Sequence, residues 1–384
     1  MISADFSPHV EISLDNLLHN VEQIRTLLSP DKKILAVVKD NSYGCGSIQI
    51  AKALEHHGNV DSFAVARPDE AFALRENGIR GSILVLGRAS LAQVEKGTLQ
   101  NITFTLNDLD DFEIWTQCKN HIHFHCNIDT AMHRLGLLPP EIPELIKEIK
   151  KNNKFHLDGA FTHLANADEP DSPTVESQRS TFFKCIDLLR SAGCTNLEIH
   201  YGNSAGLMCF PLTDYSMVRP GIALYGCQPE PNRKFCLNLK PILSLKSSVV
   251  KIKKVPAGTP VSYGGHYITP QETYIATIAI GYGNGLPRAL SNKGYVLIGG
   301  KRYRIAGNIT MDYLMVDAGP NPEIKIGDEV VVIGTQGNEQ ITPDEIARMI
   351  STISYEILCN ISNSIDRYYL FNDSIVLNKS GDIY

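Results

Sequence analysis

The stretch AVVKDNSYGCG, from Ala36 to Gly46, connects an apolar run to a lysine and then to a turn broken by glycines. The apolar run begins at Ile34 and has the length and character of a buried strand, and Lys39 stands where that strand ends. Most lysines lie on solvated surfaces, so an ordinary loop lysine is the default interpretation. The alternative is a lysine held at a strand end for chemistry, and the rest of the chain decides between the two.

Short apolar runs alternate with helical patterns over the first two-thirds of the chain. Residues 14–28 place their apolar side chains on one helical face behind Ser13, and residues 69–79 form a second helical pattern that ends at Asn77-Gly78. Further strand-like runs lie at residues 82–87, 102–106, 121–129, 155–163, 196–203 and 215–226. Repeated β-α alternation predicts a parallel sheet, and this many units predicts a (β/α)8, TIM-like barrel over residues 1–237.

The pattern changes near Lys240-Pro241. From there on, short strand-like runs separated by glycine turns follow one another, as at residues 244–255, 273–283 and 328–337. One helix interrupts them, because Thr342, Pro343 and Glu345 form a helix start signal. We therefore predict an α/β protein with an N-terminal barrel and a C-terminal mostly-β domain over residues 238–384.

Composition limits the class of protein. The 384 residues are 43% hydrophobic and 20% charged, as in an ordinary globular protein, and the formal net charge is -6. A dispersed negative charge argues against a nucleic-acid or anionic-membrane partner. The start of the chain has no signal-peptide pattern, and no apolar stretch is long enough to span a bilayer. Nine cysteines without a C-x-x-C pair favour a reducing, cytoplasmic setting.

Polar residues recur at the predicted C-terminal strand ends, where (β/α)8 enzymes carry their functional groups. These residues are Lys39, Asp129 with Arg134, His163, Asn203 with Ser204, and Arg219 with Gly221. A lysine amine can condense with an aldehyde, which pyridoxal phosphate supplies. The Ser204 turn and the backbone of Gly221 and Ile222 can offer N–H groups to a phosphate, and Tyr43 can add a phenolic donor.

Several motifs then resemble the signatures of one family in order along both domains. They are AVVKDNSYGCG (36–46), IDTAMHRLG (128–136), FTHLANADE (161–169), GNSAG (202–206), MVRPGIALYG (217–226), PVSYGG (260–265), IGYGNGLPR (280–288), GNITMDYLMVD (307–317) and SYEILC (354–359). Together they resemble the alanine racemases. The resemblance implies pyridoxal 5'-phosphate as cofactor, head-to-tail homodimers, and interconversion of L- and D-alanine that supplies D-alanine for peptidoglycan.

The resemblance also assigns roles to individual residues. It makes Lys39 the cofactor-binding lysine and one catalytic base, and Tyr263 the base on the opposite face of the substrate, reaching the neighbouring subunit's cofactor. The cofactor-binding set is Lys39, Tyr43, His163, Asn203, Ser204, Arg219, Gly221, Ile222 and Tyr355, the substrate-binding pair is Arg134 and Met311, and the entrance residues are Tyr282, Asp312 and Arg288.

These residue types suit a racemisation. Lysine and tyrosine both titrate about three units above neutral, so the site must lower the proton affinity of at least one of them. An arginine at the position of Arg219 stays charged and cannot hand its proton to a pyridine nitrogen. The ring then remains a weak electron sink, which favours return of the proton to the α-carbon, whereas a lyase of this fold would place a carboxylate there.

The chain departs from the family at a few positions. Asn127 stands where many relatives have a lysine that becomes carbamylated, so Arg134 lacks that partner; the resemblance to relatives with asparagine implies a bound chloride ion there instead. Asn308 replaces a usual arginine, and Asp40, Ser364 and Asp366 also differ. These changes alter access to the site but keep both bases. The main alternative is therefore a broad-specificity amino-acid racemase that acts on serine, lysine or arginine.

Two other classes of protein are alternatives. His121, His123 and His125 alternate along one predicted strand, and a metal-dependent hydrolase could use an H-x-H pattern. The outer two histidines lie about 13 Å apart at strand rise, so all three cannot reach one ion, and no metal is expected. A non-catalytic pyridoxal-phosphate-binding protein would lack both the β domain and Tyr263.

Overall fold

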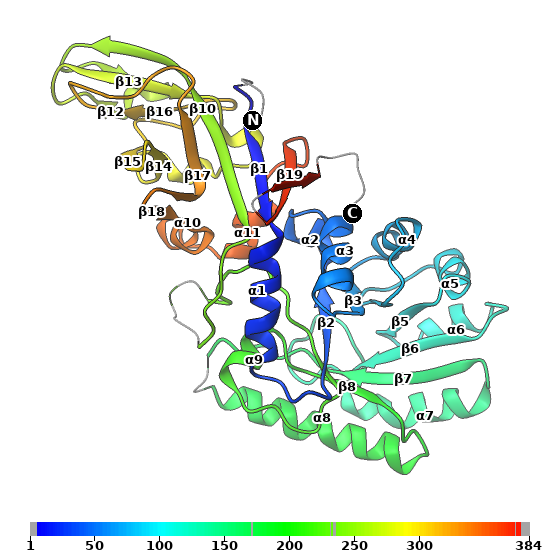
Figure 1. The fold of residues 1–384 in the computed structure, drawn as a ribbon. Helices are drawn as coiled ribbons and strands as arrows, with labels where there is room; N and C mark the ends of the chain where they lie inside the picture. Colours follow the sequence, from blue (N-terminus) through cyan, green and yellow to red (C-terminus); the bar gives the residue numbers. More distant parts are fainter. Residues whose placement is uncertain (1–5, 170–171, 231, 233–235, 373, 378–384) are drawn as a thin grey trace.

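The computed structural model describes residues 6–169, 172–230, 232, 236–372 and 374–377, which form two parts (Figure 1). One part is a parallel barrel surrounded by helices, and the other is a mostly antiparallel β domain that extends away from it. None of the helices among these residues is both long enough and apolar enough to cross a membrane. The predicted fold class is confirmed.

The barrel consists of eight parallel strands in the order β8-β7-β6-β5-β4-β3-β2-β9. A parallel bridge between Asn203 and Arg219 joins the two ends of this order, just beyond β8 and β9. The strands are β2 (Lys33–Val37), β3 (Ser62–Val65), β4 (Ser82–Val85), β5 (Ile102–Leu106), β6 (Ile122–Asn127), β7 (Phe155–Phe161), β8 (Glu198–His200) and β9 (Met217–Val218).

Helices cover the outside of the barrel. The first begins as predicted, because the Ser13 side chain accepts a hydrogen bond from Asn16 N at 3.1 Å and Leu14, Leu17 and Ile24 are buried. The helices of this part are α1 (Leu14–Arg25), α2 (Lys39–Tyr43), α3 (Ser47–His57), α4 (Pro68–Glu76), α5 (Leu91–Thr98), α6 (Asp111–Trp115), η1 (Pro139–Glu141), α7 (Ile142–Lys151), α8 (Pro173–Ser191) and α9 (Ser204–Cys209).

The second part is built on a ten-stranded sheet with the central order β15-β14-β17-β10-β1-β19-β20, to which β13, β16 and β18 add. Its strands are β1 (His9–Ser13), β10 (Leu243–Val255), β13 (Thr273–Ile278), β14 (Tyr295–Ile298), β15 (Lys301–Arg304), β16 (Leu314–Asp317), β17 (Glu329–Gln336), β18 (Glu339–Ile341), β19 (Asp366–Phe371) and β20 (Ser374–Leu377). A separate small ladder pairs β11 (Pro260–Val261) with β12 (Tyr267–Ile268). The single-turn helices η2 (Tyr263–Gly265), η3 (Tyr282–Asn284) and η4 (Arg288–Leu290) lie between strands.

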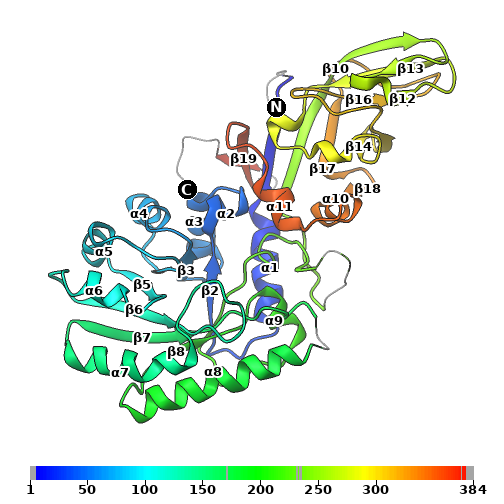
Figure 2. The same ribbon diagram turned by 180° about the vertical axis from the view of Figure 1, so that it is seen from behind.

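Not every element was predicted from the sequence, and strand β1 and helix α11 are two that were missed. Strand β1 comes from the N-terminus yet pairs antiparallel with β10 and parallel with β19, with Val10 and Ile12 buried. Helix α11 (Ser354–Cys359) follows the predicted helix α10 (Pro343–Ile350) and is too short for a 3.6-residue pattern to be read. Helix α11 packs against α2 (Figure 2). This packing brings Tyr355 to the same cavity as Lys39 and Tyr43.

Candidate active site

A cavity of about 510 Å³ opens at the C-terminal ends of the barrel strands. Its lining includes Lys39, Tyr43, Asn127, Asp129, Arg134, His163, Asn203, Ser204, Arg219, Gly221, Ile222 and Tyr355, all of which were singled out from the sequence. Residues that sequence reasoning missed complete the wall: Val37, Ala66, Leu86, Gly87, Ile128, Met132, Leu135, Phe161 and Thr162. The structure therefore brings residues from the predicted strand ends and residues from the family motifs to one cavity.

Lys39 is followed by an unusual backbone. Asp40, Asn41, Ser42 and Tyr43 all have φ between 52° and 54°, the left-handed helical region, and Gly44 follows at 85°. Left-handed helical geometry costs an L-residue roughly 1–2 kcal/mol each, so surrounding contacts must hold this turn in place. The turn is what presents both Lys39 and Tyr43 to the same cavity.

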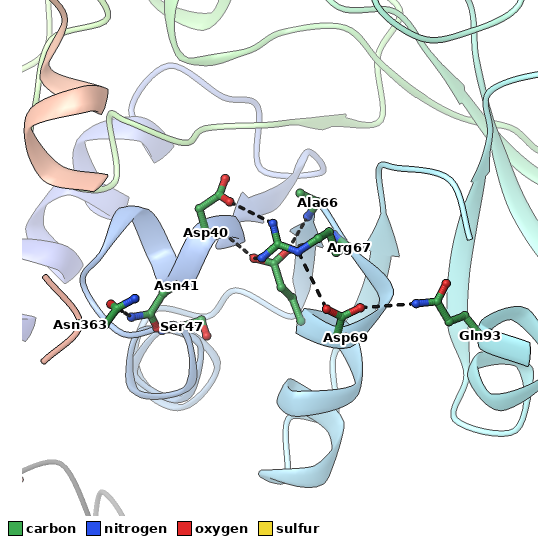
Figure 3. A network of polar contacts seen from close by, with 9 residues as sticks. Asp40, Asn41, Ser47, Ala66, Arg67, Asp69, Gln93 and Asn363 are labelled. Carbon is green, nitrogen blue, oxygen red and sulfur yellow. Dashed lines mark hydrogen bonds and ion pairs between the residues drawn. The ribbon is translucent and has the colours of Figure 1, made fainter. Parts of the chain in front are cut away.

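Glu70 is the main support of the turn. One carboxylate oxygen accepts a hydrogen bond from Asp40 N at 2.6 Å, and the other accepts from Ala66 N and Arg67 N at 2.9 Å each. Arg67 reaches back to the Asp40 carboxylate at 3.4 Å and to Asp69 at 3.9 Å (Figure 3). Glu70 thus connects the ends of β2 and β3 beside Lys39. The sequence pattern does not indicate this role, because it depends on contacts between segments that are distant in the chain.

Asn41 ties the turn to two further segments (Figure 3). Its side-chain oxygen accepts from Ser47 N at 3.0 Å, at the start of α3, and its side-chain nitrogen donates to Asn363 at 3.1 Å. Asn363 belongs to the β domain, so this second contact links the lysine turn to the other part of the chain.

Ser204, Gly221 and Tyr43 form one wall of the cavity. The Ser204 hydroxyl accepts from Gly221 N at 2.9 Å. A Cβ at Gly221 would lie 2.4 Å from the Tyr43 hydroxyl oxygen, so glycine is required for this approach. Burial raises the pKa of both Tyr43 and the neighbouring Tyr355, which keeps the phenols protonated as hydrogen-bond donors.

Arg219 is a buried cation at the same end of the barrel, with 4% of its surface exposed. Its guanidinium donates to His200 O at 2.8 Å, to His200 Nδ1 at 2.9 Å and to Thr162 O at 2.8 Å. None of the carboxylates in the described part of the chain forms an ion pair with it. Burial, with a smaller contribution from Arg134, lowers the pKa of Arg219 to about 9, so the group remains charged at neutral pH.

Two buried histidines support Arg219 from inside the barrel. Because arginine can only donate, His200 Nδ1 must accept, and His200 Nε2 then donates to His125 Nδ1 at 2.8 Å. Burial lowers the pKa of His125 to about 4 and that of His200 well below its usual value, so both rings are neutral. Burial, followed by the charge of Arg219, lowers the pKa of His163 to about 3. These three imidazoles therefore add no positive charge to that of Arg219 at neutral pH.

Asn127 and Arg134 also line the cavity. The Asn127 amide nitrogen donates to Asn107 Oδ1 at 2.9 Å and to Leu135 O at 3.0 Å. Within the described ranges Arg134 forms no ion pair with a carboxylate, although its side chain is exposed at the cavity. The arrangement leaves a cation available to an anionic group.

The remaining predicted residues do not line this cavity. Tyr263, Tyr282, Met311, Asp312 and Arg288 all lie on the β domain and are exposed, Tyr263 by 72%. Gly283 N donates to Met311 O at 2.8 Å and Tyr282 N to Thr310 O at 3.0 Å, which joins two of their loops. The chain thus contains two separate sets of predicted site residues.

The residues around the barrel cavity fit pyridoxal 5'-phosphate. Lys39 offers an amine to an aldehyde, and the Tyr43 and Ser204 hydroxyls offer donors to a phosphate. The predicted backbone donor at Gly221 is already used, because Gly221 N donates to Ser204. The buried guanidinium of Arg219, which has no carboxylate partner among the described residues, fits a ring nitrogen as acceptor. This donor set is the chemistry that such a cofactor requires.

The histidines considered as metal ligands pair differently. His121 contacts His156 at 2.7 Å, His123 contacts Asp158 at 2.8 Å, and His125 contacts His200. Across the described residues, no group of three histidine, cysteine or acidic side chains is arranged to hold a metal ion.

A barrel with a lysine at a strand end, a buried arginine and a wall of hydroxyl donors, joined to a β domain, is typical of one class of pyridoxal-phosphate enzymes. Residues 12–229 match the alanine racemase N-terminal domain and residues 242–369 match the alanine racemase C-terminal domain. The chain belongs to the alanine racemase family. Pyridoxal 5'-phosphate is the cofactor of this family.

Individual relatives are similar over nearly their whole length. An alanine racemase of Carboxydothermus hydrogenoformans is 40% identical over 365 residues, covering 94% of this chain and 98% of that protein. Alanine racemase 2 of Bacillus subtilis is 39% identical over 376 residues, covering 95% of each. The crystal structure of the Bacillus anthracis alanine racemase with bound L-Ala-P superimposes with a TM-score of 0.90 at 34% identity, covering 97% of both chains.

Proposed function

We propose that the protein is an alanine racemase that interconverts L- and D-alanine by proton transfer on both faces of the substrate. The observation that carries this proposal is that Lys39, Arg219 and the wall of hydroxyl donors surround one cavity. When bound, the cofactor withdraws electrons from the amino acid and makes its α-proton acidic. Side chains of the protein carry out the remaining steps.

Two bases divide the proton transfer. Lys39 Nζ takes or returns the α-proton on one face, and Tyr263 Oη does so on the other, so the substrate need not rotate between the two steps. Arg219 keeps its proton, since its guanidinium remains charged and already donates to His200 and Thr162. Arg219 therefore gives up no proton to the cofactor, and the α-carbon receives its new proton from the base on the opposite face.

The second base comes from another copy of the chain. Tyr263 is 72% exposed and does not line the cavity around Lys39, so a single chain does not bring the two bases together. A head-to-tail homodimer, in which the β domain (residues 238–384) of one subunit reaches the barrel (residues 1–237) of its partner, supplies it. Met311 and the entrance residues Tyr282, Asp312 and Arg288 enter the partner's site with it.

Arg134 binds the substrate carboxylate, with Met311 beside it. Because the neighbouring residue is a neutral asparagine and both amide protons of Asn127 are already donated, a chloride ion at this position depends on Arg134 for its binding. Activity that does not change when chloride is exchanged for a bulky anion contradicts the chloride site.

We place the enzyme in the cytoplasm, where it supplies D-alanine for peptidoglycan. All nine cysteines are free thiols, which suits a reducing compartment.

Deuterium exchange in heavy water, with a panel of L-amino acids and purified holoenzyme, tests the function. If label enters alanine and both enantiomers of alanine form, the result supports an alanine racemase. Label that enters serine, lysine or arginine at comparable rates supports the broad-specificity alternative that the changes at Asn127 and Asn308 raise. The absence of α-proton exchange with any amino acid contradicts both.

A further inference from the structure

The backbone beside Tyr263 is held in a rare conformation. Ser262, the residue before it, has φ 62° and ψ -176°, a region that is essentially restricted to glycine. Gly264 and Gly265 follow with φ 73° and 59°. A non-glycine residue persists in such a conformation only when its surroundings hold it there, and strained backbone of this kind gathers at functional sites.

Asn308 supplies two of the contacts that hold this segment. The Ser262 hydroxyl donates to the backbone oxygen of Asn308 at 2.5 Å, and the Asn308 side-chain nitrogen donates to the backbone oxygen of Tyr263 at 2.7 Å. A Cβ at Gly307 would lie 2.6 Å from Val261 O, so the two segments pack as closely as backbone allows. Asn308 thus contacts the chain on both sides of the Ser262–Tyr263 peptide.

The side chain of Tyr263 has few contacts of its own that fix its orientation. It is 72% exposed, and its hydroxyl makes no hydrogen bond with any of the described residues. Within one chain, the direction of the phenol is therefore set mainly by the backbone that carries it. A base must stand within hydrogen-bond reach of the proton it moves, so this backbone direction matters for catalysis.

We propose that Asn308 is a positioning residue for Tyr263. By donating to the Tyr263 carbonyl, its amide fixes the strained segment so that the phenol projects toward the partner's cavity. This inference rests on the proposed two-base function. It gives the asparagine a role beyond that of an altered entrance position.

Asn308→Asp is the sharpest test, because it keeps the shape of the side chain and removes the donor. We expect racemisation of alanine to fall roughly tenfold, because the base is misplaced. The α-deuterium exchange of the enantiomer that Lys39 serves should stay within about twofold of its original rate. Asn308→Ala should act in the same direction and decides the question if the first variant does not fold.

Ser291→Ala is the matched control. The Ser291 hydroxyl accepts from Ile309 N at 3.0 Å and donates to Arg288 O at 2.6 Å, so this variant loses two hydrogen bonds, one of them to the residue after Asn308, without removing a contact to Tyr263. Amide hydrogen exchange gives a readout independent of activity: residues 260–268 should exchange at least about threefold faster in the Asn308 variants and not in the control.

The outcomes separate the two proposals. If Tyr263→Phe lowers the exchange of only one enantiomer but Asn308→Asp lowers neither or both equally, the two-base function stands and Asn308 is not a positioning residue. If Tyr263→Phe lowers both exchanges equally, the two-base function itself is wrong.

Discussion

The segments that carry Lys39 and Tyr263 differ in how much of their environment one chain provides. Lys39 is part of an enclosed cavity, and its left-handed turn is held by Glu70 and Asn41 from within the same chain. Tyr263 projects from the β domain and is held only through its backbone. Both segments have strained backbone next to a proposed base. A single chain provides the whole surroundings of Lys39 but not those of Tyr263, and we call these two parts the enclosed half and the exposed half of the site.

The largest expected effect comes from the enclosed half. Lys39→Ala removes the amine that bonds the cofactor and also one base, so we expect racemisation to fall at least roughly 10⁴-fold. Absorbance spectra before and after borohydride treatment check the cause, since the variant should retain no covalently attached cofactor. Residual activity within a factor of ten would remove Lys39 from the mechanism.

The support of the lysine turn gives an intermediate effect. In Glu70→Gln only one oxygen remains to accept, so either Asp40 N or the amides at the start of α4 lose their partner. We expect the free energy of unfolding to fall by about 2 kcal/mol, with faster loss of cofactor on dilution. Denaturant titration and cofactor release rates measure the two effects.

Asp40→Asn is the matched control for that variant. Asparagine tolerates the left-handed conformation, and the pair with Arg67 is exposed by about half on each side, so we expect a change below about 1 kcal/mol. A larger loss than that of Glu70→Gln would show that the ion pair, and not Glu70, holds the turn.

A smaller effect is the pH dependence of stability that the buried His125 produces inside the barrel. Because burial lowers the pKa of His125 to about 4, the folded state binds fewer protons than the unfolded state between pH 6.5 and 4. The stability is therefore fully present above pH 6.5 and declines as the pH falls, by roughly 2–3 kcal/mol at pH 4.5 from this residue. His125→Gln should remove that share of the decline, which denaturant titrations at pH 7 and 4.5 would measure.

The enclosed half of the site is also the half that the sequence predicted best. Apolar runs that end in Lys39, His163 or Arg219 marked the strands and the cavity together, because a parallel barrel gathers its strand ends. Glu70 and His200 were missed, since their roles depend on contacts between distant strands that no local pattern records. Strand β1 and helix α11 were missed because one joins a remote sheet and the other has only six residues.

The residues of the β domain were found by motif resemblance alone. Nothing in the spacing of Tyr263, Met311 or Tyr282 places them near Lys39, and one chain does not bring them there. At Asn308 the sequence indicated only that a usual arginine is replaced, and the structure adds that the Asn308 amide donates to the Tyr263 backbone. Such contacts depend on the backbone geometry of two turns, which residue type does not determine.

Subunit mixing tests directly whether each active site takes its lysine and its tyrosine from different chains. Lys39→Ala and Tyr263→Phe should each be nearly inactive alone. After joint dissociation and reassociation in equal amounts, half of the dimers are hybrids with one intact site, so activity should recover to about a quarter of that of the unaltered enzyme. If the mixed preparation stays as inactive as its components while hybrids form, both bases come from one chain and the account is wrong.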